Sequence, residues 1–296
     1  MGDVASAEHL GSLKEAVGRY GIWSTGLRTE DPARHGEVAE AAAELEELGF
    51  GAAWLGGSSH VRHAAPLLRA TSRLVVATGI QSIWQYEAAE TAAHFAEVEK
   101  SHPGRFLLGL GVSHAKIADQ YRRPYSAMVA YLDALDAAGV PAGRRVLAAL
   151  GPKMLELSRD RAAGAHPYLV TPEHSVRARE IMGASPLLAP ETKVVLDKDP
   201  DSARAKARAT LALYLQLPNY TKALARFGFT EDDFAQGGSD RLVDALFAWG
   251  DDDRIRERLE AFHAAGADHV AVQVVDDGPR DALPRAAWRR LAELLR

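Results

Sequence analysis

The sequence predicts a (β/α)8 barrel, and three observations support that prediction. Eight strand-like runs of apolar residues are spread along the chain, and Ala-rich, charged segments with helical spacing lie between them. No Pro/Gly/Ser-rich linker, internal repeat or low-complexity tract divides the 296 residues. Because eight strand–helix units usually take about 250 residues before insertions, we expect residues 1–296 to form a single α/β domain.

The expected strands are short and lack a polar alternation, which is typical of strands buried on both faces of a parallel sheet. The clearest is FLLGLGV at 106–112, where Gly109 and Gly111 would allow a second backbone or a flat ligand to approach closely. In chain order the eight runs are 19–24, 52–57, 73–80, 106–112, 144–150, 166–170, 193–197 and 269–275.

The segments between the strands have the apolar spacing of amphipathic helices. They are 35–48, 86–99, 125–138, 152–163, 173–182, 202–215 and 281–295. The length beyond eight units falls between the seventh and eighth strands, so residues 218–266 are expected to form an insertion over the barrel mouth. Its expected helices are 220–226, 239–248 and 251–265.

Charge and composition exclude several classes of protein. A net charge of −5 with mixed signs argues against nucleic acid or an anionic membrane as the main partner. No apolar run is long enough to span a membrane, and residues 1–16 contain acids without an apolar core, unlike a signal peptide. We therefore expect a cytoplasmic protein with a small-molecule substrate.

The residue types restrict the chemistry further. Because cysteine is absent, thiol nucleophiles, disulfides, iron–sulfur clusters and thiolate zinc sites are excluded. His60 and His63 have no acidic or third histidine neighbour in sequence and no HExxH motif exists, so no metal site is expected. GVSH, which ends in His114, lacks the G-x-S-x-G elbow, and GLGVSH lacks the third glycine of a dinucleotide fingerprint.

Four stretches together resemble a known family. They are ATGIQSIW (77–84), GRFLLGLGVSHA (104–115), the segment 145–174 that contains LGPKM, and AGADHVAVQV (265–274). Along about residues 18–280 the chain resembles the bacterial-luciferase-like oxidoreductases, in the branch that uses the deazaflavin coenzyme F420. The resemblance implies a luciferase-like barrel and a homodimer. The excess of Arg over Lys indicates a GC-rich genome, which weakly favours F420, since the resemblance links that coenzyme mostly to actinobacteria.

The resemblance also implies where the cofactor lies. In this family a non-proline cis peptide at the end of the third strand bulges against the central ring, and the matching bond joins Gly79 to Ile80. The ring would also contact the end of the fourth strand, and Ser113 would bond the ribityl or phosphate oxygens. The phosphate would lie where a helix begins after the fifth strand, because free N–H groups and a lysine favour an anion there. The implied residues are Gly79, Ile80, Gly111, Val112, Ser113, Gly151, Pro152, Lys153 and Met154.

His114 is the catalytic candidate, since related deazaflavin enzymes place an acid or base in this loop and a histidine can donate a proton near neutral pH. After the second strand, where many relatives have an acid or histidine, this chain has Gly56, Gly57 and Ser58 instead. The substrate pocket is expected at the carboxyl ends of the strands, with Asn219 and Tyr220 above it. Its candidate residues are Trp23, Trp84, Tyr168 and His174.

The sequence therefore predicts a coenzyme F420-dependent oxidoreductase that transfers a hydride between the deazaflavin and a small organic substrate. An FMN-dependent monooxygenase served by a separate flavin reductase is the nearest alternative. A catalytically silent flavin-binding barrel and an aldolase-like barrel that forms a Schiff base on Lys198 beside Asp197 are alternatives of another class.

Overall fold

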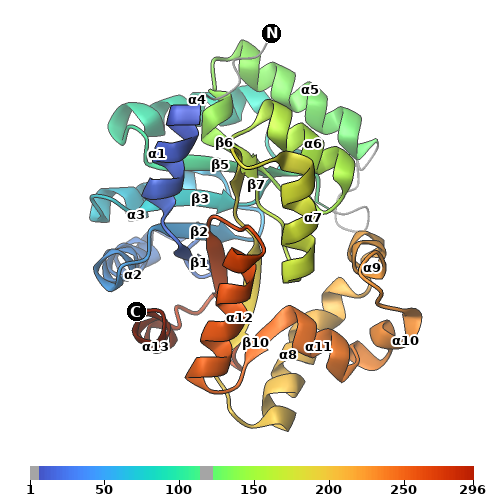
Figure 1. The fold of residues 1–296 in the computed structure, drawn as a ribbon. Coiled ribbons are helices and arrows are strands. Elements are labelled where there is room, and N and C mark those ends of the chain that lie inside the picture. Colours follow the sequence, from blue (N-terminus) through green and yellow to red (C-terminus); the bar gives the residue numbers. More distant parts are fainter. Residues whose placement is uncertain (1–6, 114–122) are drawn as a thin grey trace.

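The computed structural model describes residues 7–113 and 123–296, and its centre is a curled parallel sheet surrounded by helices (Figure 1). The ladder of strands follows the order β10-β9-β11-β1-β2-β3-β5-β6-β7-β8, with β4 paired to β5. The strands are β1 (Tyr20–Ser24), β2 (Ala52–Gly56), β3 (Val75–Gly79), β4 (Gln81–Ser82), β5 (Phe106–Gly111), β6 (Arg145–Leu147), β7 (Gly164–Ala165), β8 (Leu187–Leu188), β9 (Glu191–Val195), β10 (Phe247–Trp249) and β11 (Val270–Val274).

The sheet closes on itself because only Ala189 and Pro190 separate β8 from β9. On one side of this segment the Ala189 N–H donates to the carbonyl of Ala165, at 2.9 Å. On the other side the Ala271 N–H donates to the carbonyl of Pro190, also at 2.9 Å. The segment therefore joins β7 to β11, and the predicted (β/α)8 barrel is confirmed.

The helices are α1 (Ala7–Val17), α2 (His35–Leu48), α3 (Ala65–Ala70), α4 (Ala88–Ser101), α5 (Pro124–Ala137), α6 (Pro152–Arg161), α7 (Pro172–Met182), α8 (Pro200–Tyr214), α9 (Pro218–Ala225), α10 (Glu231–Phe234), α11 (Asp240–Leu246), α12 (Asp252–Ala264) and α13 (Arg285–Leu294). Every expected helical segment contains a helix, and α1, α3 and α10 are present in addition. In the described part of the chain no helix is both long and apolar enough to cross a membrane.

Two secondary-structure predictions are wrong. The sixth strand is Gly164–Ala165, and the expected strand 166–170 is irregular. Pro167 has no N–H to donate to a neighbouring strand. Leu169 has a φ of 55°, which is outside the range of a strand, and its N–H donates to the Glu191 carboxylate at 3.1 Å.

The second error is at 247–249, inside the expected helix 239–248. Here α11 ends at Leu246 and the chain becomes β10, which pairs with β9 and places Phe247 opposite Lys193. An apolar run this short fits either a helix face or a strand, so periodicity did not separate the two.

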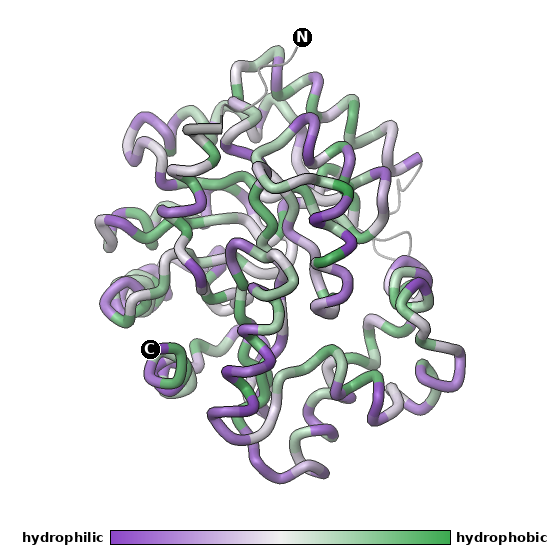
Figure 2. The backbone as a smooth tube through the Cα atoms, in the orientation of Figure 1, coloured by the Kyte–Doolittle hydropathy of each residue, from purple (hydrophilic) through white to green (hydrophobic). Residues whose placement is uncertain are grey.

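Apolar side chains pack inside the barrel beside a few buried polar ones, such as Glu191 and Lys193. Figure 2 shows hydrophobic strands at the centre and hydrophilic stretches along the outer helices. Leu13 and Val17 of α1 belong to the same buried cluster as Trp54 inside the barrel. Gly109 allows the close approach predicted for it, because a Cβ there would lie 1.9 Å from the carbonyl oxygen of Thr78.

The predicted insertion at 218–266 contains α9, α10, α11, β10 and α12, with α9, α10 and α11 at the lower right of Figure 1 beside α8. Ile255 and Leu259 of α12 belong to the main core cluster of the barrel, so the insertion proper is α9, α10, α11 and β10. It packs around its own buried apolar cluster, which includes Leu211, Leu224, Leu242 and Phe247. The insertion and α8 are therefore held together by side chains distinct from those that fill the barrel.

Candidate functional site

A cavity of about 380 Å³ opens at the carboxyl ends of the strands, the face where barrel enzymes work. Residues that follow β1, β2, β3, β5, β6 and β7 form its floor and one wall, while α8 and α9 form the facing wall. Its described lining is Trp23, Gly57, Ser58, Gly79, Ile80, Ser82, Gln85, Gly111, Val112, Ser113, Ala148, Ala149, Leu150, Met154, His166, Tyr168, Leu213, Tyr214, Leu217, Asn219 and Tyr220.

Gly79 and Ile80 lie in one wall of this cavity, and the peptide bond between them is cis, as the resemblance implies. The Trp23 indole N–H donates to the carbonyl oxygen of Gly79 at 3.0 Å, which fixes the indole beside that bond. A Cβ on Gly111 would lie 2.6 Å from Cδ1 of Ile80, so a larger residue at 111 would displace the Ile80 side chain. The predicted residues Val112 and Ser113 continue the same wall.

The start of α6 lies at the edge of the cavity, where Met154 lines it. Gly151 caps the helix with extended backbone and Pro152 follows, as the sequence predicts. Lys153 is exposed, and within the described part of the chain it forms no ion pair or hydrogen bond. A second cation, missed by the sequence analysis, is near: Nη1 of Arg226 lies 3.2 Å from the position of a Cβ on Gly151.

Arg226 follows α9, so no local motif connects it with a helix start 75 residues earlier in the chain. The structure brings the insertion back to this point, which gives the start of α6 two exposed cations. Free helix N–H groups and cations together favour an anion.

The four expected substrate residues divide into two pairs. Trp23 and Tyr168 line the cavity, with ring centroids 5.3 Å apart. Trp84 lies behind the wall and donates its indole N–H to the carbonyl of Val112 at 2.6 Å. His174 is also behind the wall, where it donates to the carbonyl of Leu150 at 3.2 Å, and burial lowers its pKa to about 4. Trp84 and His174 therefore hold the wall in place.

Below the aromatic wall lies an ion pair that the sequence analysis missed. Glu191 and Lys193 are fully buried, with their charged atoms 2.8 Å apart. Burial raises the pKa of Glu191 and lowers that of Lys193. The Lys193 ammonium lies 3.9 Å from the centre of the Tyr168 ring, and the Tyr168 hydroxyl is 2.7 Å from that of Tyr214.

His166 was also missed, because the expected strand 166–170 placed it inside a ladder. It follows β7, lines the cavity and is 1 % exposed. His114, the catalytic candidate, lies outside the described residues. Ser113, the residue before it, lines the cavity with a φ of 53°.

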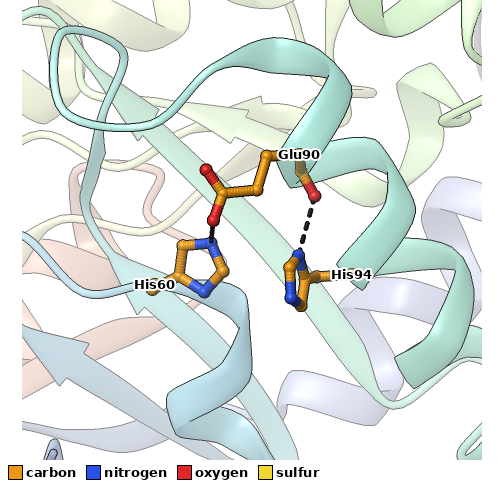
Figure 3. Close-up of side chains that lie close together, drawn as sticks. All are labelled: His60, Glu90 and His94. Carbon is orange, nitrogen blue, oxygen red and sulfur yellow. Dashed lines mark hydrogen bonds and ion pairs between the residues drawn. The ribbon is translucent and has the colours of Figure 1, made fainter.

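His60 has neighbours that its sequence position did not reveal. Ligand atoms of His60, Glu90 and His94 all lie within 4.8 Å of one another (Figure 3). However, Nδ1 of His60 accepts a hydrogen bond from the Arg62 N–H at 3.2 Å, so Nε2 of the neutral ring carries the hydrogen. Since that Nε2 faces the Glu90 carboxylate at 3.6 Å and a metal requires a lone pair, the tautomer disfavours a metal ion.

The Schiff-base alternative has no support from the geometry. Lys198 is exposed and is not among the residues that line the cavity. Asp197, beside it in sequence, instead forms an ion pair with Lys206 at 2.8 Å.

A closed parallel barrel with its cavity at the carboxyl ends of the strands defines a TIM-barrel protein whose working face binds small molecules. The chain belongs to the luciferase-like monooxygenase family, whose model matches residues 19–138 and 136–269. Its members are oxidoreductases or monooxygenases. A comparison with curated proteins found no match.

Solved structures share the fold at low identity. An F420-dependent secondary alcohol dehydrogenase with an F420–acetone adduct is 13% identical, with a TM-score of 0.70 over 94% of this chain and 99% of that one. The F420-dependent tetrahydromethanopterin reductase of Methanopyrus kandleri is 18% identical (TM-score 0.66; 95% and 97% covered). The FMN-bound oxygenating constituent of 3,6-diketocamphane monooxygenase from Pseudomonas putida is 14% identical (TM-score 0.68; 94% and 96% covered).

Proposed function

We propose that the chain is a coenzyme F420-dependent oxidoreductase that transfers a hydride between the deazaflavin and a small organic substrate. The main supporting observation is that a largely apolar cavity meets the start of α6, where Lys153 and Arg226 are exposed. A flat ring with an anionic phosphate matches this combination of surfaces. The resemblance to the F420 branch favours the deazaflavin over FMN.

The residues present fit such a cofactor. The ring would lie against Gly79, Ile80 and Gly111, where the missing Cβ of Gly111 leaves room for the Ile80 side chain. The phosphate would meet the first N–H groups of α6 with Lys153 and Arg226. When bound, F420 would supply two-electron hydride transfer, a reaction that the side chains of this protein do not provide.

The chain itself would bind and orient the cofactor and the substrate, and it would exclude water from the cavity. Trp23 and the tyrosines of the facing wall keep the substrate against the ring, and α8 and α9 cover the mouth. We propose His114 as the group that exchanges a proton with the substrate, since Ser113, the residue before it in the sequence, lines the cavity.

Cofactor preference is the decisive test of this proposal. We expect the purified protein to bind F420 more tightly than FMN, with micromolar or tighter affinity, about −8 kcal/mol, because the cofactor exchanges between enzymes. Titrations with each cofactor in both redox states, followed by tryptophan fluorescence, would show this. Tighter binding of reduced FMN, with oxygen consumed on adding substrate, would favour the monooxygenase alternative. Tight binding without turnover of any substrate would favour the silent barrel.

A charge reversal tests the phosphate position. Lys153→Glu should weaken F420 binding at least tenfold, about 1.4 kcal/mol, because it replaces an attractive charge with a repulsive one. Lys100→Glu, an exposed change in the last turn of α4 at the other end of the barrel, is the matched control and should bind normally. Unchanged affinity in Lys153→Glu, measured by the same titration, would remove Lys153 from the site.

A further inference from the structure

His166 lines the cavity, and its ring carries a buried hydrogen-bond acceptor that is unused among the described residues. Its Nδ1 lies 2.7 Å from the carbonyl oxygen of Ala189, and because a carbonyl only accepts, Nδ1 carries the hydrogen. Nε2 therefore keeps its lone pair. Among the described residues this buried Nε2 has no hydrogen-bond partner. A buried polar atom of this kind costs free energy until a donor meets it.

The imidazole is held so that this acceptor stays available. Its face stacks on Trp54, with ring centroids 4.1 Å apart and an interplanar angle of 10°. The Trp54 indole is fixed in turn, because its N–H donates to Nε2 of His269 at 3.0 Å. Burial lowers the pKa of His166 to about 4, so the ring is neutral at ordinary pH.

The rest of the described lining favours an uncharged ligand. None of the described residues that line the cavity is Asp, Glu, Lys or Arg. The nearby ammonium of Lys193 is paired with Glu191 and lies against the Tyr168 ring. Away from the start of α6, a charged group placed against the cavity wall would lose its hydration without gaining a partner, whereas an apolar ring would gain from burial.

We propose that His166 selects the substrate: an uncharged, largely apolar, ring-sized molecule whose hydroxyl or N–H donates to Nε2. The inference rests on the proposed function only in calling this molecule the substrate. The binding preference is a property of the cavity itself.

Three ring compounds of similar size test this preference in the full chain without cofactor. By calorimetry, benzyl alcohol should bind about tenfold more tightly than benzyl methyl ether, which lacks a donor. It should also bind at least tenfold more tightly than benzoate, which is charged, when inorganic phosphate is present to occupy the start of α6.

Substitution of His166 assigns the preference to its Nε2. His166→Phe keeps a ring to stack on Trp54 and should reduce the affinity for benzyl alcohol to that for the ether, leaving ether binding unchanged. His166→Gln, whose amide oxygen can replace Nε2 as acceptor, should restore part of the difference. The ether is the control for folding within each variant.

A new charge in the facing wall should change the selectivity. Leu213 lines the cavity and is 42% exposed, so Leu213→Arg adds a cation at small cost to folding and should strengthen benzoate binding about tenfold. Val176 on α7 is 47% exposed and does not line the cavity, so Val176→Arg should leave benzoate binding unchanged.

Equal binding of the alcohol and the ether by the parent protein would overturn the proposal. So would an alcohol preference that survives in His166→Phe, or a failure of all three compounds to bind. Because F420 is titrated separately, loss of cofactor binding with the alcohol preference intact would count against the proposed function alone.

Discussion

Replacing Lys193 with methionine is expected to destabilise the protein by about 3–5 kcal/mol, because it leaves the Glu191 carboxylate buried without its counter-charge. Both side chains are fully buried, so solvent does not screen the loss. The same carboxylate accepts the N–H of Leu169, in the loop that follows His166. We therefore expect the loss to loosen the cavity floor as well as lower stability. Urea unfolding followed by circular dichroism measures the change.

Two controls separate the charge effect from simple loss of packing. The double variant Glu191→Leu/Lys193→Met removes both charges and should be more stable than Lys193→Met alone. Arg177→Ala breaks an exposed ion pair with Glu180 and should cost less than about 1 kcal/mol. A cost below about 1 kcal/mol for Lys193→Met would show that the pair is not needed for stability.

His114→Ala is expected to slow hydride transfer by about 10²- to 10⁴-fold, since a positioned general acid or base contributes that much to a chemical step. F420 affinity should be retained, because the proposed contacts of the ring and phosphate come from other residues. The measurement is a single-turnover reaction, with oxidised F420 followed by its absorbance. His102→Ala, after the carboxyl end of α4 and just before β5, is the control. Equal single-turnover rates in His114→Ala and the parent would leave His114 without a catalytic role.

The sequence predicted the barrel because the signals for most β/α units lie within short stretches of the chain. The fully apolar strand at 106–112 and the glycine and proline before α6 are signals contained within a few residues. The same holds for Trp23, near the carboxyl end of β1, and for Ile80 and Ser113, which come after β3 and β5 and therefore reach the working face. The sixth strand was misplaced because Tyr168 and Leu169 lie in a buried loop. Their side chains make apolar contacts there, so the loop has the same apolar pattern as a buried strand.

What the sequence did not predict are contacts between distant segments. Arg226 reaches Gly151, and Lys193 lies against Tyr168, only because the closed barrel and the insertion bring them together. The Ala189 carbonyl binds the hydrogen on Nδ1 of His166 and so leaves Nε2 as an acceptor without a partner among the described residues. The sequence spacing of the two residues does not predict this contact. Such pairs arise from tertiary packing, so a single sequence contains no local signal for them.

The separate apolar cluster around α8, α9 and α11 has an evolutionary consequence. Leu213, Leu217 and Tyr220 shape the cavity from elements whose packing lies largely outside the barrel interior. Substitutions in this segment can reshape the facing wall of the cavity while the barrel strands stay as they are. Exchanging residues 200–246 between members of the family would therefore exchange the facing wall of the cavity as a module, while the selection proposed for His166 stays with the barrel.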